Sequence, residues 1–428
     1  MVKLGDICRI TSAKRIFESE YVPFGIPFVR GLEISDGSIG KKDTRYECYI
    51  STERYQKLKE SNGVPMRGDI LITSVGTIGN LCYVDFEHPF YYKDGNIIQF
   101  TDFQKNVDSK YLYYYMKSPY FVKQLNNALI GAVQKALTMV MLKDIEIILP
   151  DIEEQKKIAK SLSTIDEKIS NNNDICSDLE GMAKLLYDYW FVQFDFPDEN
   201  GKPYKSSGGK MVWNEELKRE IPAGWEVKPF ADCIESINTG LNPRDNFKLN
   251  TGGGIKYLTV KNLTKNGTID FSSCDTIDEE ARKIVHKRSD IQVGDILFAS
   301  IAPLGRCYII QENPEDWDIN ESLFSIRPKY ENMTSSFLYM TFMSNAFVKK
   351  AEGSSAGSVF KGIRISELLD LRTIIPSKSV LIEFDKQIGD MFLMKTNAFN
   401  ESQQLVSLRD FLLPMLMNGQ VKIKNDEA

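Results

Sequence analysis

The chain has 428 residues, of which 42% are hydrophobic and 26% are charged, and its net charge is −6. This length and composition allow two or three domains with hydrophobic cores and exclude a disordered chain. Seven scattered cysteines without a C-x-x-C pair, and only two histidines, exclude a disulfide framework and a zinc site. No signal peptide opens the sequence, and no apolar run reaches the roughly 18 residues that a membrane span needs. We expect a soluble protein of the reducing cytoplasm.

An internal repeat organises the sequence. Three blocks match after a shift of 226 positions: 67–79 with 293–305 (six of thirteen identical), 109–125 with 335–351 (seven of seventeen) and 131–150 with 357–376 (seven of twenty). Residues 26–39 also match 256–269, but with an offset of 230. The repeat is far longer than the roughly 20 to 50 residues of a solenoid unit. It therefore indicates a duplicated domain.

Each copy predicts a small α/β domain. Short apolar or alternating runs bounded by Gly, Asp and Asn, such as 69–75 and 295–301, predict strands. Residues 109–125 and their repeat have helical periodicity, and we interpret their aromatic side chains as a core face. Asp69 and Asp295 open the repeated strand, where Asp stabilises a turn through its own backbone, so we interpret them as turn residues. We find no phosphate-binding loop, no dinucleotide fingerprint and no catalytic constellation.

A long helix is predicted after each head. Between 151 and 191 no proline occurs, and apolar residues alternate by four and three in the manner of a coiled coil. The expected seam of the first helix is Ile158, Leu162, Ile165, Ile169, Cys176, Leu179, Ala183, Leu186 and Trp190, interrupted by Asn172. The expected seam of the second is Phe384, Ile388, Met391, Ala398, Leu405 and Leu412, softened by Lys395, Ser402 and Arg409. Since each copy contributes one long helix with an apolar seam, we expect the two helices to pack against each other along these seams.

The predicted fold class is α/β, with two pseudo-dyad-related α/β domains separated by two long antiparallel coiled-coil helices. The predicted boundaries are a first head at 1–150, a central helix at 151–194, a linker at 195–229, a second head at 230–376, a C-terminal helix at 377–420 and a tail at 421–428.

The chain resembles a known family in the order of its short motifs. Leu4-Gly5-Asp6-Ile7 opens the first head, residues 221–227 (IPAGWEV) open the second, Gly-Asp-Ile-Leu is repeated, and Gly-x-Val-x-Lys recurs at 131–135 and 357–361. Along essentially the whole chain this pattern is similar to the specificity (S) subunit of Type I restriction-modification enzymes. The resemblance implies that the heads are target-recognition domains, each reading one half of a bipartite asymmetric DNA site.

The same resemblance implies partners and a division of labour. The helices would set the spacing of the half-sites and dock two methyltransferase subunits, and motor-nuclease restriction subunits would join the complex for adenine methylation or restriction of double-stranded DNA. The chain itself would be non-catalytic and bind no cofactor, with S-adenosylmethionine, ATP and Mg on the partner subunits.

The charge departs from what a DNA reader should show, because such proteins are usually basic. Residues 1–150 hold 19 basic against 17 acidic residues, and residues 230–376 hold 17 against 19. We therefore expect partner subunits to supply much of the phosphate neutralisation. The candidate DNA contacts are Arg30, Lys41, Lys42, Ser74, Thr77, Gln134, Lys135, Arg244, Lys261, Ser300, Arg306 and Lys361. The two heads differ at loop positions, for example Gln134 against Phe360, so we expect different half-sites.

Aromatic residues crowd the end of the first helix, where exposure would be costly. The candidate partner-binding residues are Tyr187, Tyr189, Trp190, Phe191 and Phe194. Packing of these rings against the chain's own heads or helices is the open alternative. A second function also stays open: a duplicated coiled-coil scaffold or partner-binding protein without DNA readout would explain the acidic balance.

Overall fold

The computed structural model describes residues 1–37, 39, 44–61, 63–129, 136–331, 333–354 and 362–423, with 352–354 as backbone only. The chain divides into two compact units. Unit 1 consists of Met1–Ser170 and Gln403–Ala428, and unit 2 of Asn171–Ser402.

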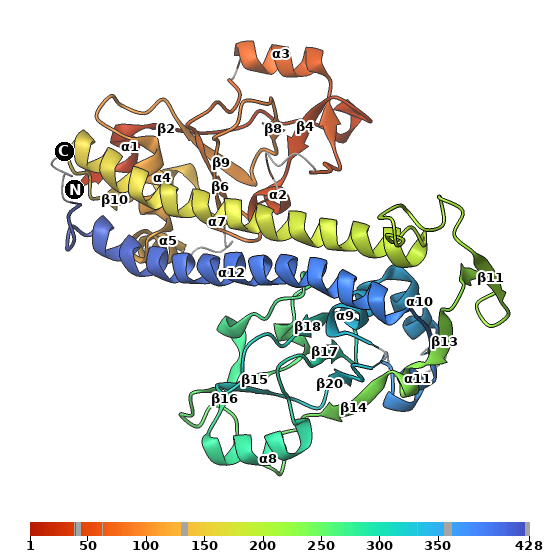
Figure 1. Ribbon diagram of the computed structural model, residues 1–428. Helices are drawn as coiled ribbons and strands as arrows, with labels where there is room; N and C mark the ends of the chain where they lie inside the picture. The colour runs from red at the N-terminus through yellow and green to blue at the C-terminus, as the bar shows by residue number, and fades with distance from the viewer. Residues whose placement is uncertain are drawn as a thin grey trace, which may run out of the picture. The chain divides into compact units, whose positions relative to one another are not determined.

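Unit 1 is built on an antiparallel four-stranded sheet in the order β2-β9-β6-β7 (Figure 1). Its strands are β2 (Arg9–Ser12), β9 (Ile97–Thr101), β6 (Ile70–Thr73) and β7 (Leu81–Tyr83). A second sheet has the order β3-β5-β4-β8, with β3 (Tyr21–Val22), β5 (Tyr49–Ile50), β4 (Ile26–Val29) and β8 (Tyr91–Tyr92). β6 and β9 are buried along their whole length, which explains why they read as continuous apolar runs.

The helices α4 (Ser109–Lys117) and α5 (Pro119–Leu129) contribute to the core of unit 1. The Asp108 side chain caps α4 by accepting a hydrogen bond from the Tyr111 amide at 2.8 Å. Tyr111, Tyr114 and Tyr115 are at most 2% exposed, so the predicted core face is confirmed. The remaining elements are β1 (Val2–Lys3), α1 (Leu4–Ile7), η1 (Glu18–Glu20), α2 (Gly31–Ser35), α3 (Thr52–Ser61), α6 (Met139–Lys143) and β10 (Glu146–Ile147).

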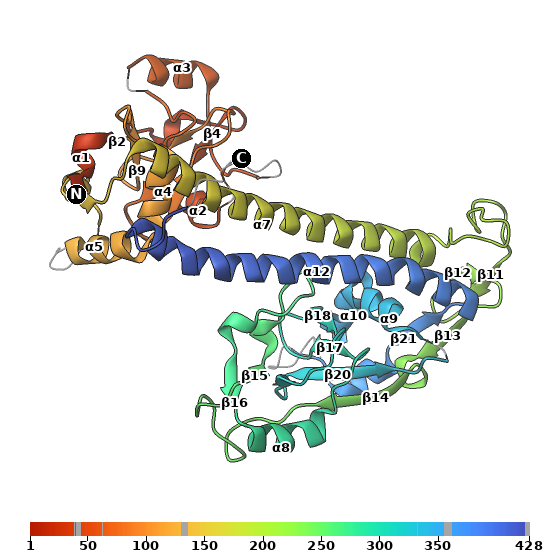
Figure 2. The same ribbon diagram turned by 60° about the vertical axis from the view of Figure 1, so that its left-hand side comes forward.

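Unit 2 repeats this plan, as Figure 2 shows. Its four-stranded sheet has the order β14-β20-β17-β18, with β14 (Ile234–Thr239), β20 (Leu323–Pro328), β17 (Ile296–Ala299) and β18 (Cys307–Ile309). A three-stranded sheet, β16-β15-β19, contains β16 (Asp275–Ile277), β15 (Ile255–Leu258) and β19 (Trp317–Ile319). The parallel pair β15 and β19 corresponds to the parallel pair β4 and β8 of unit 1. The strands β6 and β7 map onto β17 and β18 with the predicted shift of 226.

The front of the repeat has a different offset from the predicted one. Strands β4 and β15 correspond with a shift of 229, as do the capping pairs that follow them, Arg30 with Glu33 and Thr259 with Asn262. The offset is thus one residue less than the predicted 230 at the strand and its cap, whereas Gly37 and Gly267, both with positive φ (64° and 62°), keep the predicted offset. Because side chains alternate between the faces of a strand, that slip would have exchanged the buried and exposed positions.

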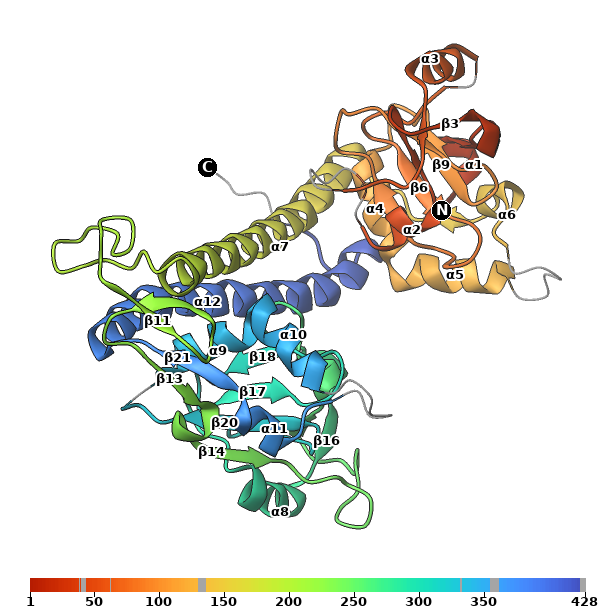
Figure 3. The same cartoon turned by 90° about the vertical axis from the view of Figure 1, so that its right-hand side faces the viewer.

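The helices of unit 2 lie around its sheets. They are α8 (Glu279–Ser289), α9 (Ser335–Met343), α10 (Asn345–Ser354) and α11 (Ile365–Asp370), with the short turns η3 (Phe230–Asp232), η4 (Val260–Asn262) and η5 (Phe271–Ser273). Two antiparallel strand pairs complete the unit: β11 (Met211–Asn214) with β12 (Arg219–Pro222), and β13 (Glu226–Pro229) with β21 (Arg372–Ile375). Figure 3 shows α9 and α10 beside α12, where the Tyr339 and Phe392 rings are 5.1 Å apart.

Two long helices pass through both units: α7 (Ile152–Tyr187), extended by the π-helical turn η2 (Asp188–Val192), and α12 (Lys378–Met417). Their segments run antiparallel in unit 2, where the Asn172 amide donates to Glu401 at 2.8 Å and Lys395 pairs with Glu180 at 2.8 Å. In unit 1, Arg409 pairs with Asp166 at 2.8 Å. None of the helices in the described ranges is long and apolar enough to span a membrane.

The predicted seams are confirmed. Ile158, Leu162, Phe384 and Ile388 are at most 2% exposed. Three of the polar residues that interrupt the seams, Asn172, Lys395 and Arg409, are paired across the helices. The fourth, Ser402, is buried without a hydrogen-bond partner for its hydroxyl among the described residues. A polar residue at such a seam favours one register over its alternatives. The predicted α/β class, the duplicated domains and the long antiparallel helices are therefore confirmed.

Candidate functional site

One residue at the end of β6 joins three segments of unit 1. The Ser74 amide donates to the Asn96 carbonyl at 2.8 Å, and its hydroxyl donates to the Gly95 carbonyl at 2.9 Å. The Ser74 carbonyl accepts a hydrogen bond from the Leu137 amide at 2.9 Å. The β6–β7 loop, the β8–β9 turn and the segment leading to α6 therefore meet at one point.

The α2 helix joins the same place. The hydroxyls of Ser35 in α2 and Thr77 in the β6–β7 loop lie 2.6 Å apart. We call residues 30–35, 74–80 and 93–96 loop cluster 1. Thr77 is exposed, whereas Ser74 is only 1% exposed. Of the two predicted contact residues, Thr77 lies on the surface and Ser74 holds the loops together.

Unit 2 builds an equivalent loop cluster 2 from residues 259–264, 300–306 and 320–322. The Ser300 hydroxyl donates to the Ser322 carbonyl at 2.7 Å, and the Ser300 carbonyl accepts from the Ile363 amide at 2.8 Å. Arg306 donates to the Leu263 carbonyl at 2.8 Å, which ties the β17–β18 loop to η4 as the Ser35 contact ties α2 in unit 1. Ser300, which is 6% exposed, and Arg306 therefore make hydrogen bonds within loop cluster 2.

A glycine closes each hairpin loop against the neighbouring helix. Gly79 and Gly305 both have positive φ, 95° and 84°. A Cβ at Gly305 would come within 2.7 Å of Val348 in α10, and one at Gly79 within 3.1 Å of Leu125 in α5. Both the backbone conformation and the close approach therefore require glycine.

The repeated aspartates are turn residues, as the sequence indicated. Asp69 accepts a hydrogen bond from the Met66 amide at 2.8 Å, and Asp295 accepts one from the Gln292 amide at 2.9 Å. Burial raises the pKa of Asp69 although its hydrogen bonds act in the opposite direction. Asp295 is instead neutralised by Arg327, whose guanidinium Nε lies 2.8 Å from the carboxylate. The interpretation as turn residues is confirmed at both positions.

The predicted cations have different surroundings. Arg30 forms ion pairs with Glu47 at 2.8 Å and Glu33 at 3.4 Å, so its charge is largely compensated within unit 1. Lys261 in η4 and Arg244 in the loop before β15 are exposed. Five further candidates lie outside the residues that the structure describes: Lys41, Lys42, Gln134, Lys135 and Lys361.

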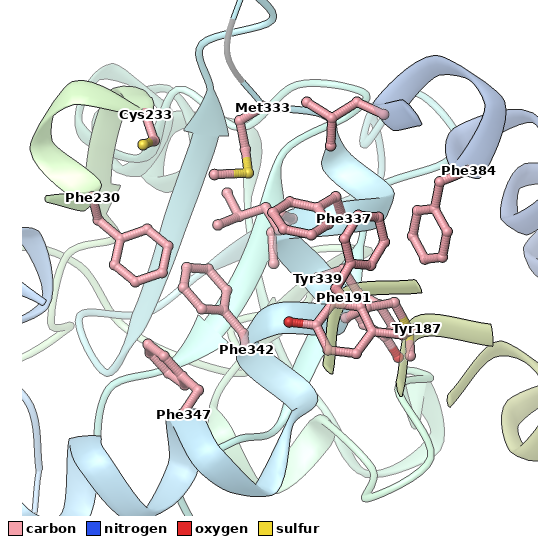
Figure 4. Close-up of a cluster of buried hydrophobic side chains, with 14 of the residues drawn as sticks. Tyr187, Phe191, Phe230, Cys233, Met333, Phe337, Tyr339, Phe342, Phe347 and Phe384 are labelled. Carbon is pink, nitrogen blue, oxygen red and sulfur yellow. The ribbon is translucent and has the colours of Figure 1, made fainter. Parts of the chain in front are cut away.

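The aromatic end of α7 corrects one prediction. Tyr187, Trp190, Phe191 and Phe194 are at most 8% exposed and belong to the core of unit 2. Figure 4 shows Phe191 and Tyr187 directed toward Phe337 and Phe384, and the Phe191 ring lies 4.6 Å from Phe337 and 4.8 Å from Phe384. These four rings pack mainly within the core of unit 2 and do not form an exposed apolar surface.

Tyr189, the remaining residue of the predicted partner-binding set, is 38% exposed and is therefore accessible to a partner. It lies on an apolar stripe of α7 and η2 that was missed, although its residues follow three-four helical spacing beside the seam. The stripe consists of Ile175, Met182, Leu185, Tyr189 and Val192, which are 38% to 71% exposed.

The two loop clusters present hydroxyls, backbone amides and a few cations. Within the described part of the chain, no group of three or more His, Cys, Asp or Glu residues is arranged to hold a metal ion. The chemistry of the clusters is that of a polar binding surface.

Comparison with known proteins identifies the family. A sequence model of the type I restriction modification DNA specificity domain matches residues 1–180 and 222–408. The chain belongs to the type I restriction-modification specificity family. The resemblance found in the sequence is thereby confirmed. The protein is the specificity subunit of a type I restriction-modification system.

Individual relatives agree with this assignment. The type I restriction enzyme MjaIX specificity subunit of Methanocaldococcus jannaschii is 29% identical, over 84% of this chain and 78% of its own length. The HindI specificity subunit of Haemophilus influenzae is 23% identical, over 64% of this chain and 68% of its own. The crystal structure of the S subunit from M. genitalium has a TM-score of 0.60 at 14% identity, covering 97% of this chain and 95% of that one. The last comparison shows that the specificity-family fold is shared.

Proposed function

We propose that each unit reads one half of a bipartite asymmetric DNA site through its loop cluster. The observation that carries the proposal is the recurrence of one loop arrangement at the ends of β6 and β17, held by Ser74 and Ser300 through equivalent hydrogen bonds. Loops fixed on a rigid sheet are suited to recognition because their exposed side chains can vary without loss of the fold.

Different half-sites follow from the differences between the clusters. Cluster 1 exposes the Thr77 hydroxyl, whereas the equivalent position in cluster 2 is Pro303, which has none. Hydroxyl and cationic side chains contact base edges and phosphates, and an apolar side chain can contact the thymine methyl group. We place Thr77, Lys261 and Arg244 as DNA contacts, together with Lys135 and Lys361 of the repeated Gly-x-Val-x-Lys motif.

The acidic balance requires help from partners. With a net charge of −6, the chain is poorly equipped to neutralise phosphates by itself. Two methyltransferase subunits that dock on the long helices would complete the phosphate clamp, and motor-nuclease subunits would join for restriction. The chain is then a non-catalytic recognition subunit, with S-adenosylmethionine, ATP and Mg held by its partners.

The apolar stripe on α7 is the docking surface that we propose in place of the four buried rings. Leu185 is 71% exposed and Met182 is 52% exposed, and contiguous exposed apolar side chains of this kind favour protein contacts. Tyr189 is the one residue of the predicted partner set that belongs to this surface.

The test exchanges residues 230–376 for the equivalent segment of a relative and maps methylated sites in DNA from cells that carry the full system. We expect one half-site of the methylated motif to change and the other to stay, because each unit has its own core. Exchange of the whole chain serves as the control that changes both. A motif that stays unchanged, or methylation without a defined motif, would support the scaffold alternative.

A further inference from the structure

Unit 2 contains a pocket that the proposed DNA readout does not use. It encloses about 630 Å³ between the end of α7 with η2, the helices α9 and α10, and β21. This volume is within the range of about 300 to 1,000 Å³ that is typical of ligand sites. Every lining residue belongs to unit 2.

The inner wall of the pocket is aromatic. Phe230 and Phe347 contribute to it, with ring centroids 5.8 Å apart, and Figure 4 shows their rings near Phe342. Tyr187 and Tyr339 also line the pocket. The π-helical turn η2 also contributes Phe191 and Val192 to the lining, and π-helical turns are frequent at functional sites.

The rim carries an excess of cations. Lys184, Arg219, Lys350 and Arg372 line the pocket, against the carboxylates of Glu180 and Asp188. Glu180 already pairs with Lys395, and Arg372 pairs with Glu216 at 3.4 Å.

Arg219 contacts a carbonyl and an aromatic ring. Its guanidinium donates to the Val192 carbonyl at 2.8 Å and lies 4.5 Å from the centre of the Phe194 ring. Burial lowers the pKa of Arg219, in agreement with a guanidinium that is partly desolvated without a close carboxylate. A carboxylate entering the pocket would supply the missing charge.

The duplication shows what fits this place. The shift of 226 maps Ala346 and Val192, which both line the pocket, onto Tyr120 and Asn418 of unit 1. There the Asn418 side chain donates to the Tyr120 hydroxyl at 2.6 Å, so an aromatic residue of α5 bridges to the end of α12. At the position of Ala346, unit 1 therefore carries a tyrosine that is 42% exposed and bonded to Asn418, whereas unit 2 has only a methyl group.

We infer that the pocket of unit 2 receives an aromatic side chain flanked by a carboxylate, presented by one of the docked partner subunits. The aromatic wall fits the ring, the cationic rim fits the acid, and Tyr120 shows the type of group that the fold accommodates. This inference rests on the proposed docking of partners. It makes the two docking faces unequal, because only unit 2 takes an anchor from its partner.

The first test uses 4-phenylbutyrate as a stand-in for the anchor, with binding to the full chain measured by calorimetry and ligand-observed NMR. We expect saturable binding that is at least tenfold weaker in Ala346→Trp, where the added ring fills the pocket. Lys349→Trp is the matched control, since Lys349 is exposed on the same helix and does not line the pocket. We also expect 4-phenylbutanol, which lacks the carboxylate, to bind more weakly than 4-phenylbutyrate.

The second test counts methyltransferase subunits on the chain by native mass spectrometry and measures the affinity of each. We expect Ala346→Trp to weaken one of the two copies at least tenfold and to leave the other unchanged. Thermal unfolding followed by circular dichroism checks that both tryptophan variants are folded.

Several outcomes would overturn the inference. They are the absence of 4-phenylbutyrate binding, binding that Ala346→Trp does not reduce, and equal binding of 4-phenylbutanol. If the probe is lost in Ala346→Trp but both partner copies bind as before, the occupant is a small aromatic acid and not a partner. A wild-type chain that binds no methyltransferase subunit would instead contradict the proposed function, and that result is distinguishable because it does not depend on the variant.

Discussion

The ion pair between Arg327 and Asp295 supports the central sheet of unit 2, and Arg327→Met should destabilise that unit strongly. The guanidinium contacts both oxygens of Asp295, at 2.8 and 2.9 Å, and also reaches the Asp290 carboxylate at 3.1 Å. The side chain of Asp295 is 1% exposed and that of Arg327 is 16% exposed. Among the described residues, the variant would leave the buried Asp295 carboxylate with the Gln292 amide and the Ser325 hydroxyl as partners.

The expected loss is about 3 to 5 kcal/mol, which is typical when one partner of a buried ion pair is removed. Unit 2 spans residues 171 to 402, or 402 − 171 + 1 = 232 residues. For this size each kcal/mol lowers the melting temperature by about 2 to 4 °C, so the midpoint should fall by roughly 6 to 20 °C. The Asp295 contact raises the pKa of Arg327, so the guanidinium stays charged and we expect the same loss across the neutral pH range.

Hydrogen exchange followed by mass spectrometry is the suitable assay, because a chain of two units need not unfold in one step. Amides of β17 and β20 should lose protection, while those of β6 and β9 keep theirs. Arg288→Met is the control, since Arg288 is exposed and its guanidinium donates to the neutral Thr239 hydroxyl at 3.2 Å. Adding Asp295→Asn to Arg327→Met should recover part of the loss because it removes the unpaired charge. A loss below about 1 kcal/mol, or equal loss of protection in both units, would refute the reasoning.

Three further predictions concern the loops, a buried acid and the helices. Gly305→Ala should lower the melting temperature of unit 2 more than Gly76→Ala lowers that of unit 1, because both have positive φ but only at Gly305 would the Cβ meet Val348; equal shifts would contradict this. Asp69 has a raised pKa in the folded state, so its contribution to the free energy of unfolding should decrease as pH rises above the ordinary value of about 3.9. Asp69→Asn does not lose a proton over this range. Urea titrations should therefore favour the variant over the wild type more at pH 7 than at pH 4. A constant difference would show that burial does not control the acid. One heptad inserted into both α7 and α12 lengthens them by about 10 Å, equivalent to about three base pairs, so a methylome should show a longer gap or no modification; full methylation of the original motif would show that the helices do not measure the gap.

The sequence alone determined the repeat, the long helices and their seams. These features follow from local regularities: a three-four spacing of apolar residues specifies a helix pair, and the identical Gly-Asp-Ile-Leu blocks specify the same strand entry twice. The turn role of Asp69 and Asp295 was predictable for the same reason, since the hydrogen-bond partner of each lies only three residues away.

Tertiary structure decided what local patterns could not. The cluster of aromatic residues at the end of α7 has the same sequence whether it is exposed or buried. Only the packing of Phe191 against Phe337 and Phe384 shows that the cluster belongs to the core. Ser74 and Ser300 look like surface hydroxyls in sequence, yet carbonyls brought from about twenty residues away engage them. The pocket beside Ala346 depends on six segments that meet only in the folded unit: 180–192, 217–219, 230, 339–350, 371–374 and 392. Burial and long-range hydrogen bonds are properties of the assembled fold, which is why the sequence located the recognition heads but not the surfaces that they use.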